Sequence, residues 1–249
     1  MVLNWRNKVV ENFDKKSSCY DQNNILQRTV AGEMMKDLPL LKRADADILE
    51  VGCGTGVLTR NLVHKYQGQN LRITDISPQM LEQAKTKIRG NISWTLLDAE
   101  NDRIKKSYDL IVANMVFQWF EDLEKGILNL VNALKPDGSL FFTVPGPESF
   151  KEWRAILRHH NLPSGILNFK EPPGVYRKNN IFMPHQRAWD FLQSVKNMGA
   201  SCPREGYVPL SSSQMRRACD SFDLQNSGGV TWQILYGHLS RSNYAASHV

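Results

Sequence analysis

A glycine-rich segment, EVGCGTG at residues 50–56, constrains the fold of this chain more than any other feature. It follows the apolar run at residues 47–51 and precedes a helical pattern over residues 57–66, so it predicts a strand, a tight loop and a helix. Glycine lets the backbone turn sharply and approach a ligand closely. The start of the following helix offers unpaired N–H groups and the positive end of the helix dipole. The loop is therefore a candidate binding site for a small molecule.

Alternating strand and helix patterns continue beyond this loop. Apolar runs rich in strand-forming residues predict four more strands, at 71–74, 92–97, 108–113 and 140–144. Helices are expected between them at 78–89 and 123–134, the second ending at the turn Pro136-Asp137-Gly138. Short connections between such elements require crossovers, so we expect a doubly wound α/β fold around a mainly parallel sheet. Its ligand crevice should lie at the carboxyl ends of the strands.

The alternation stops after Pro145, and two later strands bring the expected sheet to seven strands. Helices are predicted at 149–160, 187–198 and 211–222, a loop at 161–173, and the two strands at 175–182 and 230–239. We expect a single domain in four parts: a helical lid arm at 1–43, a cofactor-binding core at 44–145, a substrate-side insertion at 146–229 and a closing strand at 230–249.

Composition narrows the class of protein. The 249 residues carry 31 Lys or Arg against 25 Asp or Glu, a net charge of +6, which favours an acidic partner such as nucleic acid, an acidic protein or an anionic metabolite. No apolar run is long enough for a membrane span, and the charged start does not resemble a secretory signal. The six histidines show no metal or triad spacing, so no metal site is expected. The four widely spaced cysteines indicate reduced thiols of a cytoplasmic protein: Cys19, Cys53, Cys202 and Cys219.

Three acidic residues near the predicted strand ends point to a nucleoside ligand. Asp75 follows the second strand, where a carboxylate can accept hydrogen bonds from both ribose hydroxyls, and Asp98 follows the third, where it can face an adenine amino group. The alternative is that both are ordinary turn residues. Glu50 lies inside an apolar strand, and because a buried carboxylate is costly unless it is paired, we expect it to reach the loop backbone or the ligand. The GxGxG spacing differs from the GxGxxG of dinucleotide sites.

Four motifs, in order, resemble class I S-adenosylmethionine-dependent methyltransferases, which have a Rossmann-like fold: ILEVGCGTG, TDISPQML, Asp98-Ala99 and ALKPDG. The resemblance implies S-adenosylmethionine as cofactor. It implies that Asp75 holds the ribose, that Asp98 and Ala99 flank the adenine, and that Asn114 lies below the methyl donor. The implied cofactor-binding set is Glu50, Gly52, Gly54, Gly56, Asp75, Ile76, Asp98, Ala99 and Asn114.

Further segments, most of them outside this core, resemble one family of methyltransferases, the malonyl-acyl-carrier-protein O-methyltransferases of early biotin synthesis. They are residues 13–20, 26–28, 114–119, 191–200 and 231–238. Trans-aconitate methyltransferases share the core but resemble the last 60 residues less well. Ser17-Ser18 departs from the family's usual alanines in the arm. The fourth strand is not followed by the Asn-Pro-Pro-Tyr motif of base and amide methylation, which counts against DNA and amide acceptors.

The resemblance implies methyl transfer to a carboxylate, a reaction that needs no general base, so rate must come from proximity, alignment and exclusion of water. The implied catalytic residues are Tyr20, Gln27, Asn114, Gln118 and Trp119. We expect a cation of the insertion, such as Arg154 or Arg158, to hold the malonyl group. The expected partner is an acidic acyl carrier protein carrying malonyl-phosphopantetheine, or malonyl-coenzyme A, with a monomeric enzyme and no nucleic acid.

Two alternatives stay open at this stage. One is another small-molecule carboxylate or an RNA as acceptor on the same core. The other is a cofactor-binding subunit without catalysis, against which the presence of Asn114, Gln118 and Trp119 argues.

Overall fold

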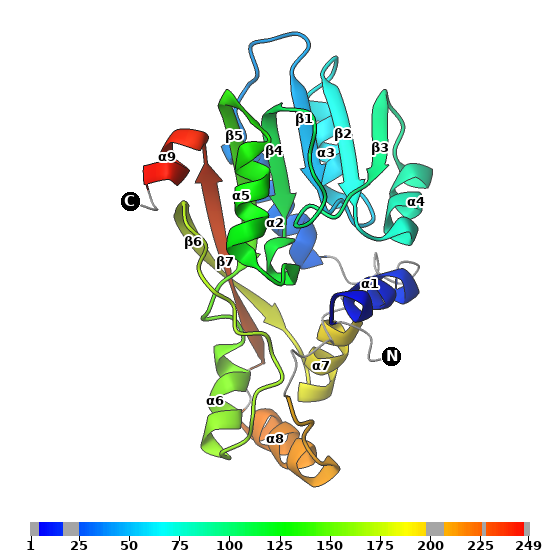
Figure 1. Ribbon diagram of the computed structural model, residues 1–249. Helices are drawn as coiled ribbons and strands as arrows, with labels where there is room; N and C mark the ends of the chain where they lie inside the picture. The colour runs from blue at the N-terminus through cyan, green and yellow to red at the C-terminus, as the bar shows by residue number, and fades with distance from the viewer. Residues whose placement is uncertain (1–4, 17–24, 198–206, 226–227, 247–249) are drawn as a thin grey trace.

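The computed structural model describes residues 5–16, 25–197, 207–225 and 228–246. Seven strands form one sheet in the order β3-β2-β1-β4-β5-β7-β6 (Figure 1). Neighbours from β3 to β5 run parallel, whereas β7 is antiparallel to both β5 and β6. The bounds are β1 Asp47–Val51, β2 Asn70–Asp75, β3 Ile92–Leu96, β4 Tyr108–Asn114, β5 Leu134–Pro145, β6 Val175–Pro184 and β7 Gly229–Leu239. The predicted doubly wound, mainly parallel seven-stranded α/β fold is confirmed.

Helices cover both faces of this sheet and extend beyond its lower edge (Figure 1). They are α1 Trp5–Lys16, α2 Ile25–Asp37, α3 Val57–Lys65, α4 Pro78–Lys87, the 3₁₀ turn η2 Phe117–Trp119, α5 Leu123–Asn132, α6 Lys151–His159, α7 Ala188–Asn197, α8 Ser212–Leu224 and α9 Arg241–Ala246. Within the described residues, no helix is long and apolar enough to cross a membrane.

Alternate residues of the central strands supply two separate apolar cores. Ile48 and Val112 face α2, α3 and α4, whereas their neighbours Leu49 and Ile111 face α5 and α9. Because successive side chains of a strand point to opposite faces, both faces of a covered parallel sheet must be apolar. This explains why the central strands appear as continuous apolar runs in the sequence.

Two segments differ from the sequence-based prediction. Residues 136–138, predicted as a turn, lie inside β5, where the pairing with β4 shifts register between Tyr108 and Leu110. Leu134 pairs with Tyr108, and the pairing resumes at Ser139 with Leu110, so the residues between form a bulge-like irregularity. The strand therefore begins at Leu134, earlier than the predicted start at residue 140. The helix α9 was not predicted. Its start is marked by a reciprocal pair in which the Ser240 amide donates to Asn243 Oδ1 and the Asn243 amide donates to Ser240 Oγ.

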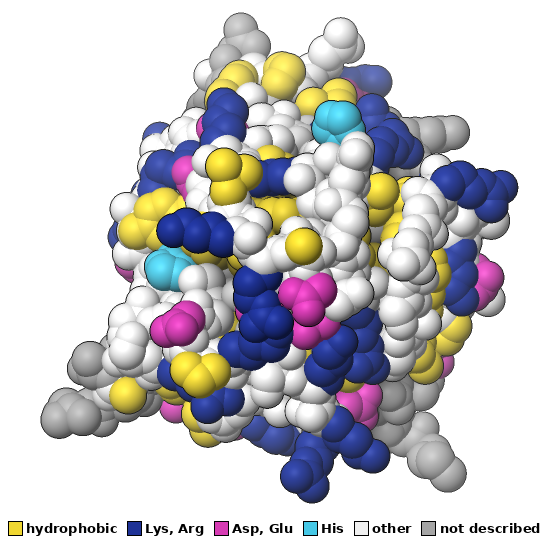
Figure 2. All heavy atoms as spheres, turned by 90° about the horizontal axis from the view of Figure 1, so that it is seen from above, with side chains coloured by type: hydrophobic (Ala, Val, Ile, Leu, Met, Phe, Trp, Pro, Cys, Tyr) yellow, Lys and Arg dark blue, Asp and Glu magenta, His cyan; other side chains and the backbone are white. Residues whose placement is uncertain are grey.

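The end of the molecule that carries the amino ends of the parallel strands is rich in lysine and arginine (Figure 2). Some of this charge is paired: Lys106 and Lys135 lie 2.6 and 2.9 Å from the carboxylate of Asp47. Partial burial opposes ionisation of Asp47, but the hydrogen bonds from these two ammonium groups lower its pKa to about 2. This basic face lies at the opposite end of the sheet from the glycine loop.

The arm helix α2 is fastened to the antiparallel edge of the sheet. The guanidinium of Arg177 on β6 lies 3.7 Å from the ring centre of Tyr236 on β7. The same group forms an ion pair with Asp37 and lies 3.8 Å from a carboxylate oxygen of Glu33, both on α2. The cluster therefore connects α2, which carries Gln27, to the two antiparallel strands of the sheet.

Packing between β5 and β7 gives a test of this fold. Gly237 lies opposite Phe142, and a Cβ added at Gly237 would stand 1.9 Å from Phe142 Cζ. Gly237→Ala must therefore displace a buried ring, and we expect it to lower the free energy of unfolding by about 1–3 kcal/mol in urea denaturation. Gly32→Ala on α2 is the matched control, because a Cβ at this position meets nothing within 4 Å. This change should raise the free energy of unfolding by about 0.5–1 kcal/mol. Equal effects of the two changes would contradict the packing explanation.

Candidate active site

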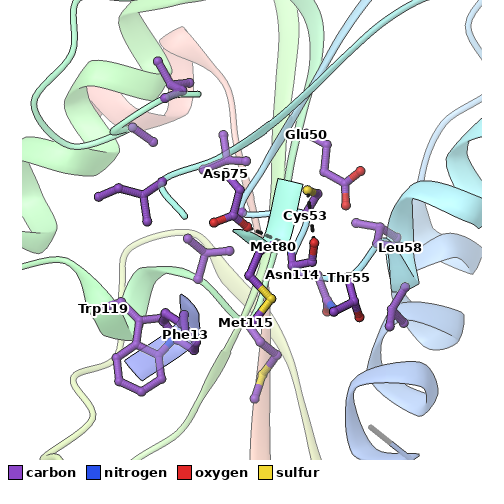
Figure 3. A pocket seen from close by; sticks show the side chains of 18 of the residues that line it. Phe13, Glu50, Cys53, Thr55, Leu58, Asp75, Met80, Asn114, Met115 and Trp119 are labelled. Carbon is purple, nitrogen blue, oxygen red and sulfur yellow. Dashed lines mark hydrogen bonds between the residues drawn. The ribbon is translucent and has the colours of Figure 1, made fainter. Parts of the chain in front are cut away.

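Two cavities lie at the carboxyl ends of the parallel strands, and they share Gln27, Met115 and Trp119. The first cavity, of about 120 Å³, is bounded by the ends of β1, β2 and β4 and by α1 (Figure 3). The second cavity, of about 330 Å³, is bounded by η2, α6, α7 and residues between 163 and 215. Its walls are mainly aromatic and aliphatic, and include Phe150, Trp153, Leu157, Ile166, Leu192 and Trp232.

The glycine loop forms one wall of the first cavity. Gly52, Gly54 and Gly56 have φ values of 66°, 54° and 90°, in the left-handed region that favours glycine. A Cβ on Gly52 would stand 2.5 Å from Val116 Cγ2, and one on Gly56 would stand 2.4 Å from Ile88 Cδ1. A Cβ on Gly54 would meet nothing within 4 Å. Gly52 and Gly54 line the cavity, whereas Gly56 caps α3 and does not line it.

Asp75 connects this loop to the end of β2. Its carboxylate accepts hydrogen bonds of 2.8 Å from the backbone amides of Gly54 and Ser77. Burial raises the pKa of Asp75 to about 6, although these amide hydrogen bonds favour the ionised form. Ser77 also caps α4 by accepting from the Met80 amide, and its hydroxyl donates to Asp14 on α1 over 2.5 Å. The cavity wall, α4 and the arm are thus joined by one chain of hydrogen bonds.

Glu50 is a buried acid at the end of β1 that lines the same cavity. Its Oε2 atom has no hydrogen-bond partner among the described residues. Burial, together with the nearby carboxylate of Asp75, raises the pKa of Glu50 to about 8, so the group is protonated at neutral pH. A buried polar atom without a partner is costly, and a bound ligand is one explanation for it.

Helix α1 of the arm forms one wall of the first cavity. The residues of α1 that form this wall were not predicted from the sequence. Val9, Val10 and Phe13 line the cavity, and the Phe13 ring meets Trp119 edge-on with centroids 5.2 Å apart (Figure 3). The spacing of Trp5, Val9 and Phe13 along one helix face was the signal that could have identified this wall.

The segment after β4 provides the boundary between the two cavities. Asn114 lines the first cavity, Gln118 lines the second, and Trp119 lines both. The Gln118 side chain donates from Nε2 to the backbone carbonyl of Met115 over 2.7 Å, and its buried Oε1 has no partner among the described residues. Gln27, which lines both cavities, likewise has a buried Oε1 without a described partner.

The remaining predicted residues are placed as follows. Ile76 and Ala99 line the first cavity. Asp98 is not among its lining residues: its carboxylate accepts hydrogen bonds from the backbone amides of Glu100 and Asn101, in its own turn. Tyr20 lies outside the described residues, as do Ser17, Ser18, Cys19 and Cys202.

The cations expected to hold an acceptor carboxylate do not line either cavity. Arg154 donates to the backbone carbonyls of Ser149 and Leu167 at 3.0 and 2.9 Å, and burial lowers its pKa. Arg158 is exposed on α6. Among the described lining residues of the second cavity, Lys196 is the one basic side chain, and it is exposed.

Comparisons with known proteins agree over nearly the whole chain. A protein family described as Methyltransferase domain matches residues 49–140. The malonyl-[acyl-carrier protein] O-methyltransferase of Magnetococcus marinus is 30% identical over 257 residues, which cover 96% of this chain and 94% of that protein. The protein of the same name from a Methylovorus species is 32% identical, with 93% and 87% covered.

Solved structures support the fold. The phosphoethanolamine N-methyltransferase 2 of Haemonchus contortus, in complex with S-adenosyl-L-methionine, has a TM-score of 0.56 at 14% identity, over 96% of this chain and 60% of that one. The YcgJ protein of Bacillus subtilis has a TM-score of 0.54 at 16% identity, over 84% and 97%. Given the relatives at 30% and 32% identity, the chain belongs to the malonyl-[acyl-carrier protein] O-methyltransferase family and is an S-adenosylmethionine-dependent O-methyltransferase.

Proposed function

We propose that this chain methylates the free carboxylate of a malonyl thioester on acyl carrier protein, giving the methyl ester that starts pimelate-chain assembly for biotin. One observation carries the proposal: the cavity at the glycine loop, which contains the acids Glu50 and Asp75, meets a second, apolar cavity at Gln27, Met115 and Trp119. The relatives of that name align with both the core and the insertion, so the walls of both cavities fall within the alignment.

The first cavity fits the cofactor. Gly54 leaves open space where a side chain would stand, and the buried oxygens of Glu50 and Gln27 lack partners among the described residues. We assign the ribose hydroxyls to Asp75 and the adenine to the apolar wall that includes Ile76 and Ala99. When bound, S-adenosylmethionine supplies a methyl group on a positively charged sulfur that can leave as a neutral thioether.

The second cavity is the proposed path of the acceptor. Its apolar walls suit the chain of a pantetheine thioester, and Lys196 suits an anionic group near the entrance. Exposed cations on the neighbouring helices, Arg158 on α6 with Arg216 and Arg217 on α8, suit an acidic carrier protein. The acceptor carboxylate would then reach the methyl group of the cofactor at Gln27, Met115 and Trp119, the residues that line both cavities.

The protein has little covalent chemistry to perform. The carboxylate oxygen forms the new bond to the methyl carbon while the carbon–sulfur bond breaks, its electron pair stays on sulfur, and no proton is released. In the proposed reaction Trp119, Met115 and Gln27 align the two reactants, and α1 with Phe13 excludes water from the first cavity.

The direct test is the identity of the methylated acceptor. We expect the purified protein and S-adenosylmethionine to add one methyl ester to malonyl-acyl-carrier protein, detected by intact-protein mass spectrometry. Parallel reactions contain malonyl-coenzyme A, trans-aconitate and tRNA, and the gene should restore growth to a biotin-requiring strain that lacks this step. Methylation of trans-aconitate or tRNA, with none on either thioester, would replace this proposal with another acceptor.

Two tryptophans provide a matched pair for the same assay. Trp119 lines both cavities, whereas Trp189 on α7 is 57% exposed. Trp119→Ala should lower kcat/KM for the thioester by about 10- to 100-fold, since alignment of the reactants supplies most of the rate. Trp189→Ala should leave it within about twofold of the unchanged protein. Similar losses in both variants would contradict the placement of the acceptor.

The proposed role of Asp75 predicts a pH-dependent affinity for the cofactor. The ionised carboxylate accepts hydrogen bonds from the ribose, and its pKa of about 6 in the free protein means that it is charged above pH 6 and neutral below. Affinity for S-adenosylhomocysteine in calorimetry should be constant above about pH 7 and fall about tenfold by pH 5. Asp75→Asn should cost about 1.5–3 kcal/mol at pH 7.5 and remove the excess pH dependence. An Asn variant that keeps the slope of the unchanged protein would exclude Asp75 as its source.

A further inference from the structure

Thr143 on β5 is a polar residue between the buried apolar side chains of Phe142 and Val144, and its own side chain is fully buried. It lies opposite Asn114 in the register of β4 and β5. The Thr143 hydroxyl donates to Asn114 Oδ1 over 2.7 Å and accepts from the backbone amide of Met115 over 3.0 Å. A hydroxyl has one hydrogen to donate, so this geometry commits that hydrogen to Asn114.

These contacts determine which way the Asn114 amide points. If the amide were reversed, its Nδ2 group would face the hydroxyl, and the buried hydroxyl hydrogen would lose its acceptor. Leaving a buried donor unpaired is more costly than the gain from an ordinary hydrogen bond. The Oδ1 atom is therefore kept on the Thr143 side, and Nδ2 is left for the first cavity, which Asn114 lines (Figure 3).

The same hydroxyl supports a strained turn. Met115 has a φ of 58°, which is uncommon for a residue with a side chain, and its amide donates to both the hydroxyl and the backbone carbonyl of Thr143. The Met115 carbonyl in turn accepts from Gln118. Thr143 thus lies behind the segment that separates the two cavities, without lining either one.

We propose that Thr143 is a positioning residue that orients Asn114 so that its Nδ2 group donates a hydrogen bond to a carboxylate oxygen in the first cavity. The inference rests on the proposed function. Two carboxylates come near this wall in that proposal, one on the methionine part of the cofactor and one on the malonyl acceptor. A neutral amide donor can orient either carboxylate by a hydrogen bond without neutralising the negative charge of that carboxylate.

The test compares hydroxyl-free and hydroxyl-retaining variants. Thr143→Val keeps the volume and removes the hydroxyl, Thr143→Ala is a second hydroxyl-free variant, and Thr143→Ser restores the hydroxyl. Each is made alone and together with Asn114→Ala. Calorimetry gives the Kd of S-adenosylhomocysteine, steady-state kinetics give KM and kcat for the malonyl thioester, and thermal unfolding monitors folding.

We expect Thr143→Val or Thr143→Ala to change the Kd of S-adenosylhomocysteine, or kcat/KM for the malonyl thioester, by about tenfold. Thr143→Ser should bring the same constant to within about threefold of the unchanged protein. A rise in the Kd assigns Nδ2 to the cofactor carboxylate. A rise in KM or a fall in kcat at unchanged Kd assigns it to the acceptor. In the Asn114→Ala background the same changes at Thr143 should have less than about a twofold effect, because the group through which Thr143 acts is gone.

An equal loss with and without Asn114, or no rescue by serine, would overturn the proposal and leave Thr143 with a packing role. Unchanged Kd, KM and kcat in a folded hydroxyl-free variant would overturn it as well. Failure of the proposed function looks different, because no thioester would then be methylated by the unchanged protein. The calorimetric comparison stays decisive for the cofactor carboxylate in that event.

Discussion

The hydrogen bond from the Gly54 amide to the Asp75 carboxylate is the contact on which the wall of the first cavity depends. It joins the glycine loop after β1 to the end of β2, two segments that the chain brings together only through the parallel sheet. The second oxygen of Asp75 accepts from Ser77, which caps α4 and donates to Asp14 on the arm. One carboxylate therefore connects the loop, the start of α4 and, through Ser77, helix α1.

This arrangement keeps two acids in a buried site. Asp75 is surrounded by amide donors that favour its charge, whereas Glu50 has an oxygen without a described partner and a pKa of about 8. The two carboxyl groups are close enough for the charge on Asp75 to raise the pKa of Glu50. Opposite protonation states at neutral pH lower the repulsion between them, and they leave one charged and one neutral group facing the same ligand.

The second cavity, the proposed acceptor site, differs from the first in the residues that line it. Aromatic rings line the second cavity, among them Trp153 on α6 and Trp232 on β7, and the centroids of Phe150 and Trp232 lie 4.3 Å apart. Near the boundary with the first cavity, polar groups are supplied by Gln27 from α2 and Gln118 from η2. Since α2 is fastened to the sheet edge by Arg177, the position of Gln27 depends on contacts far from it in sequence.

The sequence by itself determined the α/β class, the parallel core and the glycine loop, because these follow from local patterns of apolar residues, glycine and strand-end acids. It also pointed to Asp75, whose place at the end of β2 follows directly from the strand order along the chain. The structure of residues 136–138 and the contacts of Asp98 were less predictable, since a turn motif can be absorbed into a strand and a strand-end acid can cap its own turn.

Only the tertiary structure decided which side chains meet. Phe13 reaches Trp119, Thr143 orients Asn114, and Arg154 turns to backbone carbonyls instead of a cavity. Such pairings join positions far apart in the chain, and no local periodicity encodes them. They result from the register of β4 with β5 and from the packing of the arm and the insertion on the edges of the sheet, where burial makes each polar group find a partner or a ligand.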